Sequence, residues 1–374
     1  MNSVAQFHFV PAYVGRAYQQ VPQTQSVAQW RICALDIATS TGLRFDEQQQ
    51  ALVGTPQQAG QYAVQIFYQA TDKSTAILSA VAQLTIHADP RSLWQNIPSR
   101  PDIYPKPDSQ SQMLNNSDYQ LVAASQRGRA HAHKGLCRDD DYFIAAQENW
   151  AIAIVADGAG SANYSRYGAY LACQQAGLFL QQTLNQAPCN PQQVERYLQQ
   201  AAACAWHAIE QAARQQHVST NAYATTLLIL VVWRQDGQFH YLSLGIGDGV
   251  LALYEPEQPL VCLHQPETGQ YAGETQFLNA QTLAQVQVKH YVSLIPRAVW
   301  LMTDGVSDAF FESENALQQP QHWQQLDAQI GTTAQQAESL LAWLDFWSAG
   351  NHDDRTIVLL RRRTNESSHS ANSL

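Results

Sequence analysis

The sequence is poor in charged residues, and positive charge is the scarcer of the two signs. Charged side chains make up 14% of the 374 residues, with 21 Lys and Arg against 31 Asp and Glu and a net charge of −10. Lys and Arg form no basic stripe along the sequence, so the composition excludes nucleic acid as an expected partner. A small phosphorylated ligand would also be repelled unless cations lie between it and the protein.

Paired cysteines, a leader segment and long apolar runs are also missing. The six cysteines are scattered without a Cys-x-x-Cys pair, which predicts reduced thiols in a cytosolic protein. The first residues lack the basic and apolar segments of a signal peptide. No apolar run reaches the roughly 18 residues that a membrane span needs. We therefore expect a soluble, cytoplasmic protein with no membrane association.

The first part of the chain, residues 1–95, is predicted to be a small all-β domain. A chain of 374 residues is long for one domain, and two is the natural expectation. In one strand-like segment Tyr62, Val64, Ile66 and Tyr68 share an apolar face, while the intervening glutamines lie on the other. This alternation favours a small β-sandwich.

Residues 96–118 are predicted to be a linker. Four prolines fall between Pro98 and Pro107, and a Ser-, Gln- and Asn-rich piece follows up to Asp118. Such a composition favours an extended, semi-rigid chain with few contacts across the boundary. We therefore expect a chain that begins near Ser117 to function without the first domain.

Residues 119–363 are predicted to form a layered α+β domain. A long amphipathic helix is expected over Pro191–Gln216 with Asn190 as its cap, and a second over Tyr164–Leu184. Helices separated from several strand-like runs favour a layered sheet-and-helix arrangement. The Ser- and Asn-rich tail, residues 364–374, is expected to be disordered. The strand-like runs are 151–156, 226–233, 239–246, 250–254, 298–303 and 356–360.

Four aspartates lie at the ends of apolar, strand-like runs or just before one. They are Asp140 in an acidic cluster, Asp157 and Asp304 each directly before a glycine, and Asp353 before the last run. A buried carboxylate costs several kcal/mol unless it is paired or bound to a metal. Few basic residues lie nearby, and an all-oxygen ligand set suits Mg²⁺ or Mn²⁺ rather than zinc.

Each of these motifs also has a purely structural interpretation. Asp157 could cap a helix, although Gly158 would let backbone carbonyls approach a cation closely. Asp248, within a Gly-Asp-Gly sequence, is typical of a hairpin turn. Ser307 and Asp308 could cap the helix that follows.

Five motifs follow one another along the chain: Val155-Ala156-Asp157-Gly158, Ala224-Thr225-Thr226-Leu227, Gly247-Asp248-Gly249, Thr303-Asp304-Gly305-Val306-Ser307-Asp308 and His352-Asp353-Asp354-Arg355-Thr356. Together with the acidic cluster at Asp140 and in this order, they resemble the motifs of the metal-dependent type 2C (PPM) protein serine/threonine phosphatases. The resemblance covers residues 119–360. Gly128-Arg129-Ala130-His131 and Tyr271–Leu278 narrow it to a bacterial subfamily whose members are often encoded beside kinases and von Willebrand A-type proteins. The runs 42–46, 52–56 and 59–62 belong to a stretch of about fifty residues that resembles bacterial immunoglobulin-like domains of the putative-Ig type.

The resemblance implies a phosphatase 2C-like β-sandwich flanked by helix pairs, in αββα layers. It further implies that Asp157 bridges two Mg²⁺ or Mn²⁺ ions. A water that also bridges the ions, with its pKa lowered by them, would attack the phosphorus of phosphoserine or phosphothreonine. The implied ligands beside Asp157 are the Gly158 carbonyl, Asp304 and Asp353, with Asp140 or its neighbour Asp139 on the other side through water. Asp248 and Asp308 match positions that hold a third, weaker metal in some relatives.

Three positions depart from the family pattern. The phosphate-binding arginine of the family falls at Lys134 or Gly135, so His131, His133, Lys134 and Arg138 are the candidate substitutes. The alternative for His131 and His133 is that both simply lie in a solvated loop. Ala159 stands where many eukaryotic relatives carry a histidine, and Asp354 replaces the usual asparagine, which adds a negative charge. The segment 255–296 falls where relatives place a variable flap that shapes substrate choice.

The sequence thus predicts a two-domain enzyme that removes phosphate from serine and threonine in proteins and counters a partner kinase. The alternative is a phosphatase-fold pseudoenzyme that acts as a binding or regulatory scaffold, which the missing arginine favours. Aspartates kept without metal would repel one another, which opposes that alternative. A third interpretation, an acidic adaptor organised by its β domain, leaves the aspartates unexplained.

Overall fold

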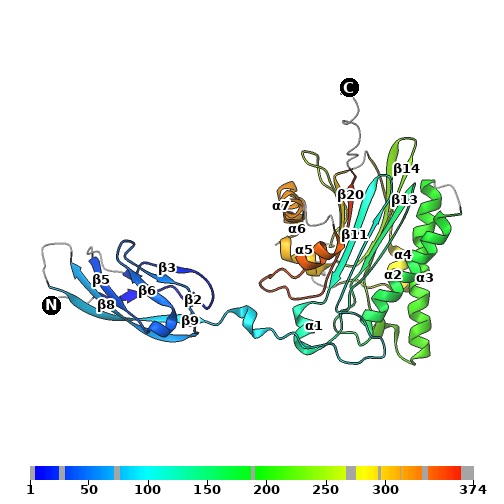
Figure 1. The fold of residues 1–374 in the computed structure, drawn as a ribbon. Coiled ribbons are helices and arrows are strands. Elements are labelled where there is room, and N and C mark those ends of the chain that lie inside the picture. Colours follow the sequence, from blue (N-terminus) through cyan, green and yellow to red (C-terminus); the bar gives the residue numbers. More distant parts are fainter. Residues whose placement is uncertain are drawn as a thin grey trace, which may run out of the picture. The chain divides into compact units, whose positions relative to one another are not determined.

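The chain forms two compact units, residues 1–95 and residues 96–374. The computed structural model describes residues 5–24, 30–70, 76–186, 190–266, 275–293, 296–311, 313–330 and 336–363 (Figure 1). The predicted tail, 364–374, and residues 267–274 of the segment expected to be a flap lie outside the described residues.

The first unit is built from strands around one apolar core. Val64, Ile66 and Tyr68 are fully buried on the inner face of strand β8 (Gly60–Ala70), and Tyr62 is partly buried against the same core, which confirms the alternation predicted for this strand. The all-β prediction is therefore confirmed, and kinship with immunoglobulin-like domains stays a prediction. A four-stranded sheet has the order β2 (Ala12–Tyr13), β9 (Leu78–His87), β8 (Gly60–Ala70), β5 (Trp30–Asp36); a three-stranded sheet the order β3 (Tyr18–Gln20), β7 (Ala51–Gly54), β6 (Leu43–Asp46); and β1 (Phe7–His8) pairs with β4 (Gln23–Thr24).

The second unit contains two antiparallel sheets that pack face to face. Their inner faces bury a continuous layer of side chains, among them Leu230 from one sheet and Leu301 and Val358 from the other. The six-stranded sheet has the order β10 (Ser109–Asn115), β11 (Tyr119–Gln126), β20 (Arg355–Arg362), β19 (Ala298–Met302), β16 (Val250–Tyr254), β17 (Val261–His264). The five-stranded sheet has the order β12 (Asp141–Gln147), β13 (Trp150–Ala156), β14 (Leu227–Gln235), β15 (Gln238–Ile246), β18 (Lys289–Ser293).

Helices cover the outer face of each sheet, so the predicted αββα layering is confirmed (Figure 1). None of the described helices is long and apolar enough to cross a membrane. The five-stranded sheet is covered by α2 (Ser165–Leu184) and α3 (Pro191–Gln215), and the six-stranded sheet by α5 (Asp304–Phe310), α6 (Glu314–Leu317), α7 (Pro320–Ile330) and α8 (Ala337–Trp343). Two short helices, α1 (Arg129–Lys134) and α4 (Ala280–Gln285), lie in connections.

Helix α3 begins where the sequence predicts. The Asn190 side chain accepts a hydrogen bond from the Gln193 amide at 2.9 Å, and Pro191 occupies the first turn. Its apolar stripe, including Val194 and Leu198, is fully buried against α2 and the sheet. Burying one such side chain contributes roughly 1.5–3 kcal/mol.

The predicted linker over residues 96–118 is wrong, because this segment is part of the second unit. Strand β10 pairs with β11 along its whole length. Upstream of it, the Tyr104 ring stacks on Tyr167 with centroids 3.9 Å apart, and Lys106 Nζ lies 2.9 Å from Asp141 Oδ2. An extended, proline-rich chain is also the conformation that an edge strand and a surface-packed segment require, so composition alone could not separate the two.

Candidate metal centre

Three aspartates from different connections converge at one edge of the sandwich. Asp157 follows β13, Asp304 opens α5 after β19, and Asp248 lies between β15 and β16, where the chain passes from one sheet to the other. One carboxylate oxygen from each lies within 4.8 Å of the other two. The topology therefore brings together residues that are about 150 positions apart in sequence.

This cluster carries unbalanced negative charge. Burial, followed by repulsion from Asp248, raises the pKa of Asp304 to about 8. Burial, followed by repulsion from Asp354, raises the pKa of Asp140 to about 7. Burial and the nearby Asp140 also raise the pKa of Asp157 well above its ordinary value. Carboxylates in such a state are stabilised by divalent cations.

The residues present fit such cations. Oδ1 of Asp140 and Oδ1 of Asp248 are buried and meet no hydrogen-bond partner among the described residues. A Cβ at Gly158 would lie 2.8 Å from the Ser165 carbonyl oxygen and 3.0 Å from that of Asp139, so only glycine fits this turn. All donors are oxygens, the set that Mg²⁺ and Mn²⁺ prefer.

The structure separates Asp140 from Asp139, which the sequence left open. Asp140 accepts a hydrogen bond from Thr303 Oγ1 at 2.8 Å and faces the cluster. The Asp139 carboxylate instead accepts from Ser165 Oγ at 3.0 Å and lies 3.7 Å from His131 Nε2. Asp139 therefore borders the cluster, and Asp140 belongs to it.

Asp308 and Asp353 lie at the margin of the same cluster. Burial and then the nearby Asp248 raise the pKa of Asp308, and burial and then Asp354 raise that of Asp353. The alternative that Ser307 and Asp308 cap the following helix does not hold, because Ser313 is the N-cap of α6. Helix α5 already begins at Asp304, and Asp308 lies inside it.

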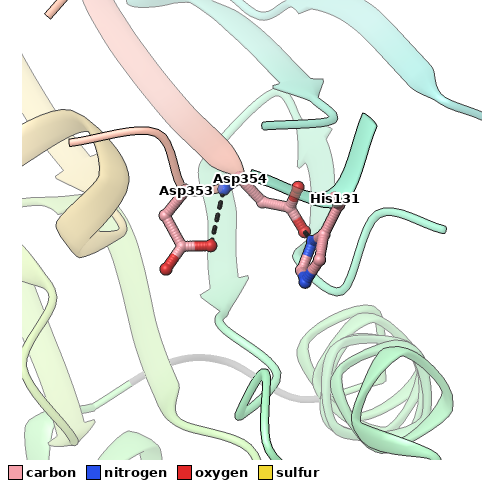
Figure 2. Close-up of side chains that lie close together, drawn as sticks. All are labelled: His131, Asp353 and Asp354. Atoms are coloured by element: carbon pink, nitrogen blue, oxygen red, sulfur yellow. Dashed lines mark hydrogen bonds and ion pairs between the residues drawn. The ribbon is translucent and has the colours of Figure 1, made fainter. Parts of the chain in front are cut away.

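Asp354 is an anchoring group rather than an uncompensated charge. Its carboxylate accepts hydrogen bonds from the amides of Gly128 at 2.6 Å and Asp139 at 2.5 Å and from His131 Nδ1 at 2.9 Å. Figure 2 shows the imidazole directed at Asp354, while the Asp353 carboxylate points away from it. Burial alone would raise the pKa of Asp354, but the hydrogen bond from His131 and the two amides hold it below its ordinary value.

The four candidate phosphate contacts differ in their exposure. Arg138 is fully buried, with Nη2 3.4 Å from Gln110 Oε1, so its proposed role as a phosphate contact is wrong in this structure. His131 is 7% exposed and bonded to Asp354. His133 and Lys134 are exposed at the end of α1. Only these last two have side chains open to solvent.

Sequence reasoning missed Lys106 as part of the site. Its Nζ donates to the carbonyl oxygens of Asp140 at 2.5 Å and Asp139 at 3.4 Å, beside the ion pair with Asp141. This ammonium group therefore fixes the backbone of the turn that carries Asp139 and Asp140. A lysine in a proline-rich stretch carried no signal for this contact.

The sequence of the chain matches the profile of one known protein family. The sequence profile described as protein phosphatase 2C matches residues 127–345. No curated protein matches the chain significantly. Among solved structures, the chain is similar to RsbX in complex with magnesium (17% identity, TM-score 0.40, 68% of this chain and 100% of that one). It is also similar to the Mycobacterium tuberculosis serine/threonine phosphatase PstP/Ppp (14%, 0.41, 65% and 98%) and to PppA of Pseudomonas aeruginosa (16%, 0.42, 67% and 100%). These structural likenesses are too weak to extend the activity of those proteins to this one.

Proposed function

This chain belongs to the protein phosphatase 2C family, and on that premise we propose that it hydrolyses phosphoserine and phosphothreonine in proteins with Mg²⁺ or Mn²⁺. The observation that carries the proposal is the convergence of Asp157, Asp248 and Asp304 with the buried, unpartnered Oδ1 of Asp140. In a scaffold that bound no cation, repulsion between these carboxylates would lower the stability of the fold.

Each acidic residue has a distinct part in holding the ions. Asp157, at the centre of the cluster, would be shared between two of them, with Asp304 and Asp353 on one side and Asp140 on the other. The bound cations would supply a water of lowered pKa as the nucleophile and would neutralise the phosphate. Asp248 and Asp308 are the proposed ligands of a third ion, although the closeness of Asp248 to Asp157 also suits it to the main pair.

The surrounding residues orient these ligands. Thr303 holds the Asp140 carboxylate, and the Thr225 hydroxyl and Thr226 amide donate to the Asp157 carbonyl oxygen at 2.9 and 2.8 Å. His133 and Lys134 are the proposed phosphate contacts, because they combine a basic side chain with exposure on α1. A kinase that phosphorylates the same protein, or a von Willebrand A-type protein, is the partner that the sequence resemblance favours.

One observation favours the alternative of a binding scaffold: Lys134 or Gly135 stands where the family pattern has its phosphate-binding arginine, and the nearby Arg138 is fully buried. Hydrolysis of p-nitrophenyl phosphate and of a phosphothreonine peptide separates the two. We expect turnover with Mn²⁺ or Mg²⁺ and none after chelation, and restoration when the ion is returned. Binding of the phosphopeptide without any turnover would support the scaffold instead.

A further inference from the structure

A pocket of about 590 Å³ lies next to the metal centre. Its walls come from the turn after Asp157, from the middle of α3, from residues 220–224 and from the segment 275–285, which includes α4. Trp206 of α3 contributes its half-buried ring, and Gln281 and Gln285 of α4 contribute exposed amides. Four separate parts of the chain thus line the pocket.

The pocket adjoins the metal centre at two points, one through the chain and one through a hydrogen bond. Ala159, on its wall, is two residues after Asp157, and its amide donates to the Ala224 carbonyl oxygen at 3.0 Å. From the segment 275–285, Thr275 Oγ1 donates to Asp248 Oδ2 at 2.5 Å. A peptide whose phosphate reached the aspartate cluster would therefore have a neighbouring residue at this pocket.

The pocket is uncharged. No Asp, Glu, Lys or Arg is among the described residues that line it, although the whole chain has a net charge of −10. The alanines, Trp206, Phe277 and Leu278 offer apolar contact, and the remaining lining side chains are hydroxyls and amides. A charged side chain placed here would lose water without gaining an ionic partner, whereas an apolar or amide side chain would find suitable contacts.

We propose that this pocket binds the segment of the substrate phosphoprotein next to the phosphorylated residue and selects uncharged side chains there. The proposal rests on the proposed phosphatase function and adds its substrate class: phosphoserine or phosphothreonine in a neutral sequence context. Discrimination arises because acidic neighbours leave a desolvated carboxylate beside an already acidic cluster.

The test compares kcat/KM for three phosphothreonine peptides that differ in the residues on both sides of the phosphothreonine. These flanking residues are Ala, Gln and Leu in the neutral peptide, Glu in the second peptide and Lys in the third. We expect the neutral peptide to be preferred over the Glu peptide by about tenfold. Gln281→Lys places a cation at the pocket, and we expect the Glu-to-neutral ratio to rise about threefold. The matched control is Ala284→Lys, which adds the same charge on an exposed position of α4 outside the pocket lining and should leave the ratio unchanged.

If the ratio of kcat/KM for the Glu peptide to that for the neutral peptide changes equally in Gln281→Lys and Ala284→Lys, or in neither variant, the pocket assignment is wrong. A wild-type preference for charged neighbours overturns it as well. Both results leave phosphatase activity itself intact. If the wild-type protein hydrolyses none of the three peptides with Mg²⁺ or Mn²⁺, the proposed function fails and the pocket proposal fails with it.

Discussion

His131 Nδ1 lies 2.9 Å from Asp354 Oδ2, and this pair fastens the turn that carries Asp139 and Asp140 to the start of β20. Burial would lower the pKa of His131, but the hydrogen bond to Asp354 raises it to about 9, so the pair is ionic at neutral pH. Backbone also packs closely here: a Cβ at Gly128 would lie 2.2 Å from the Asp353 carbonyl carbon. The metal ligands on either side are thus positioned by one buried ion pair.

We expect His131→Ala to lower the free energy of unfolding by about 3 kcal/mol, because it leaves the buried Asp354 carboxylate without its cation. Replacing both partners, His131→Ala with Asp354→Asn, should recover part of that loss, since the uncompensated charge is removed. Urea unfolding of the two single variants and the double variant measures the coupling. Additive losses would show that the two side chains do not act as a pair.

Asp157→Asn and Asp304→Asn should each reduce turnover by roughly 100-fold or more, because each removes a negative charge that holds a cation. Stability without metal should stay the same or rise, since repulsion within the cluster falls. The rise in melting temperature caused by Mg²⁺ or Mn²⁺ should shrink.

The matched control for these two variants is Asp236→Asn, an exposed aspartate in the β14–β15 turn whose backbone has φ of 52°. Asparagine tolerates that conformation, so turnover and metal response should match the wild type. Turnover near wild type in Asp157→Asn would contradict the site assignment.

The metal-free protein should lose stability as pH rises from about 5 to about 8.5. The pKa of Asp140 is raised to about 7 and that of Asp304 to about 8, so the native state binds these protons more tightly than the unfolded state. Their contribution is complete below the ordinary value near 4 and is lost as pH rises through about 7 and 8. The raised pKa of His131 acts in the same direction.

Thermal melting in chelator across this pH range tests the prediction. Saturating Mg²⁺ or Mn²⁺ should flatten the dependence, because cations replace the protons. A metal-free melting temperature that climbs over the same range would contradict it.

Truncation at two points should give opposite results. A chain that begins at Asn96 retains β10 and Lys106, and we expect it to fold and to hydrolyse p-nitrophenyl phosphate. A chain that begins near Ser117 exposes the edge of β11 and leaves the buried Asp141 without its ammonium partner. We expect the shorter chain to be destabilised by about 3 kcal/mol or more. Circular dichroism and activity distinguish the two, and equal stability would restore the linker interpretation.

The sequence by itself determined those features that depend on neighbours in the chain. The cap at Asn190 and the apolar stripe of α3 follow from helical spacing, and the inner face of β8 follows from alternation. The strand-then-Asp-Gly pattern at Asp157 and Asp304 was equally visible, because a strand end, a turn and a carboxylate occupy only a few consecutive residues.

The tertiary structure decided where the side chains of the connections point. Asp139 and Asp140 are adjacent, yet Ser165 binds one and Thr303 the other. Lys106 is part of the site, while Arg138, two residues before Asp140, is buried away from solvent. Spacing cannot predict these outcomes, because each carboxylate or cation is directed by partners from distant strands and helices, and only folding brings those partners within hydrogen-bonding distance.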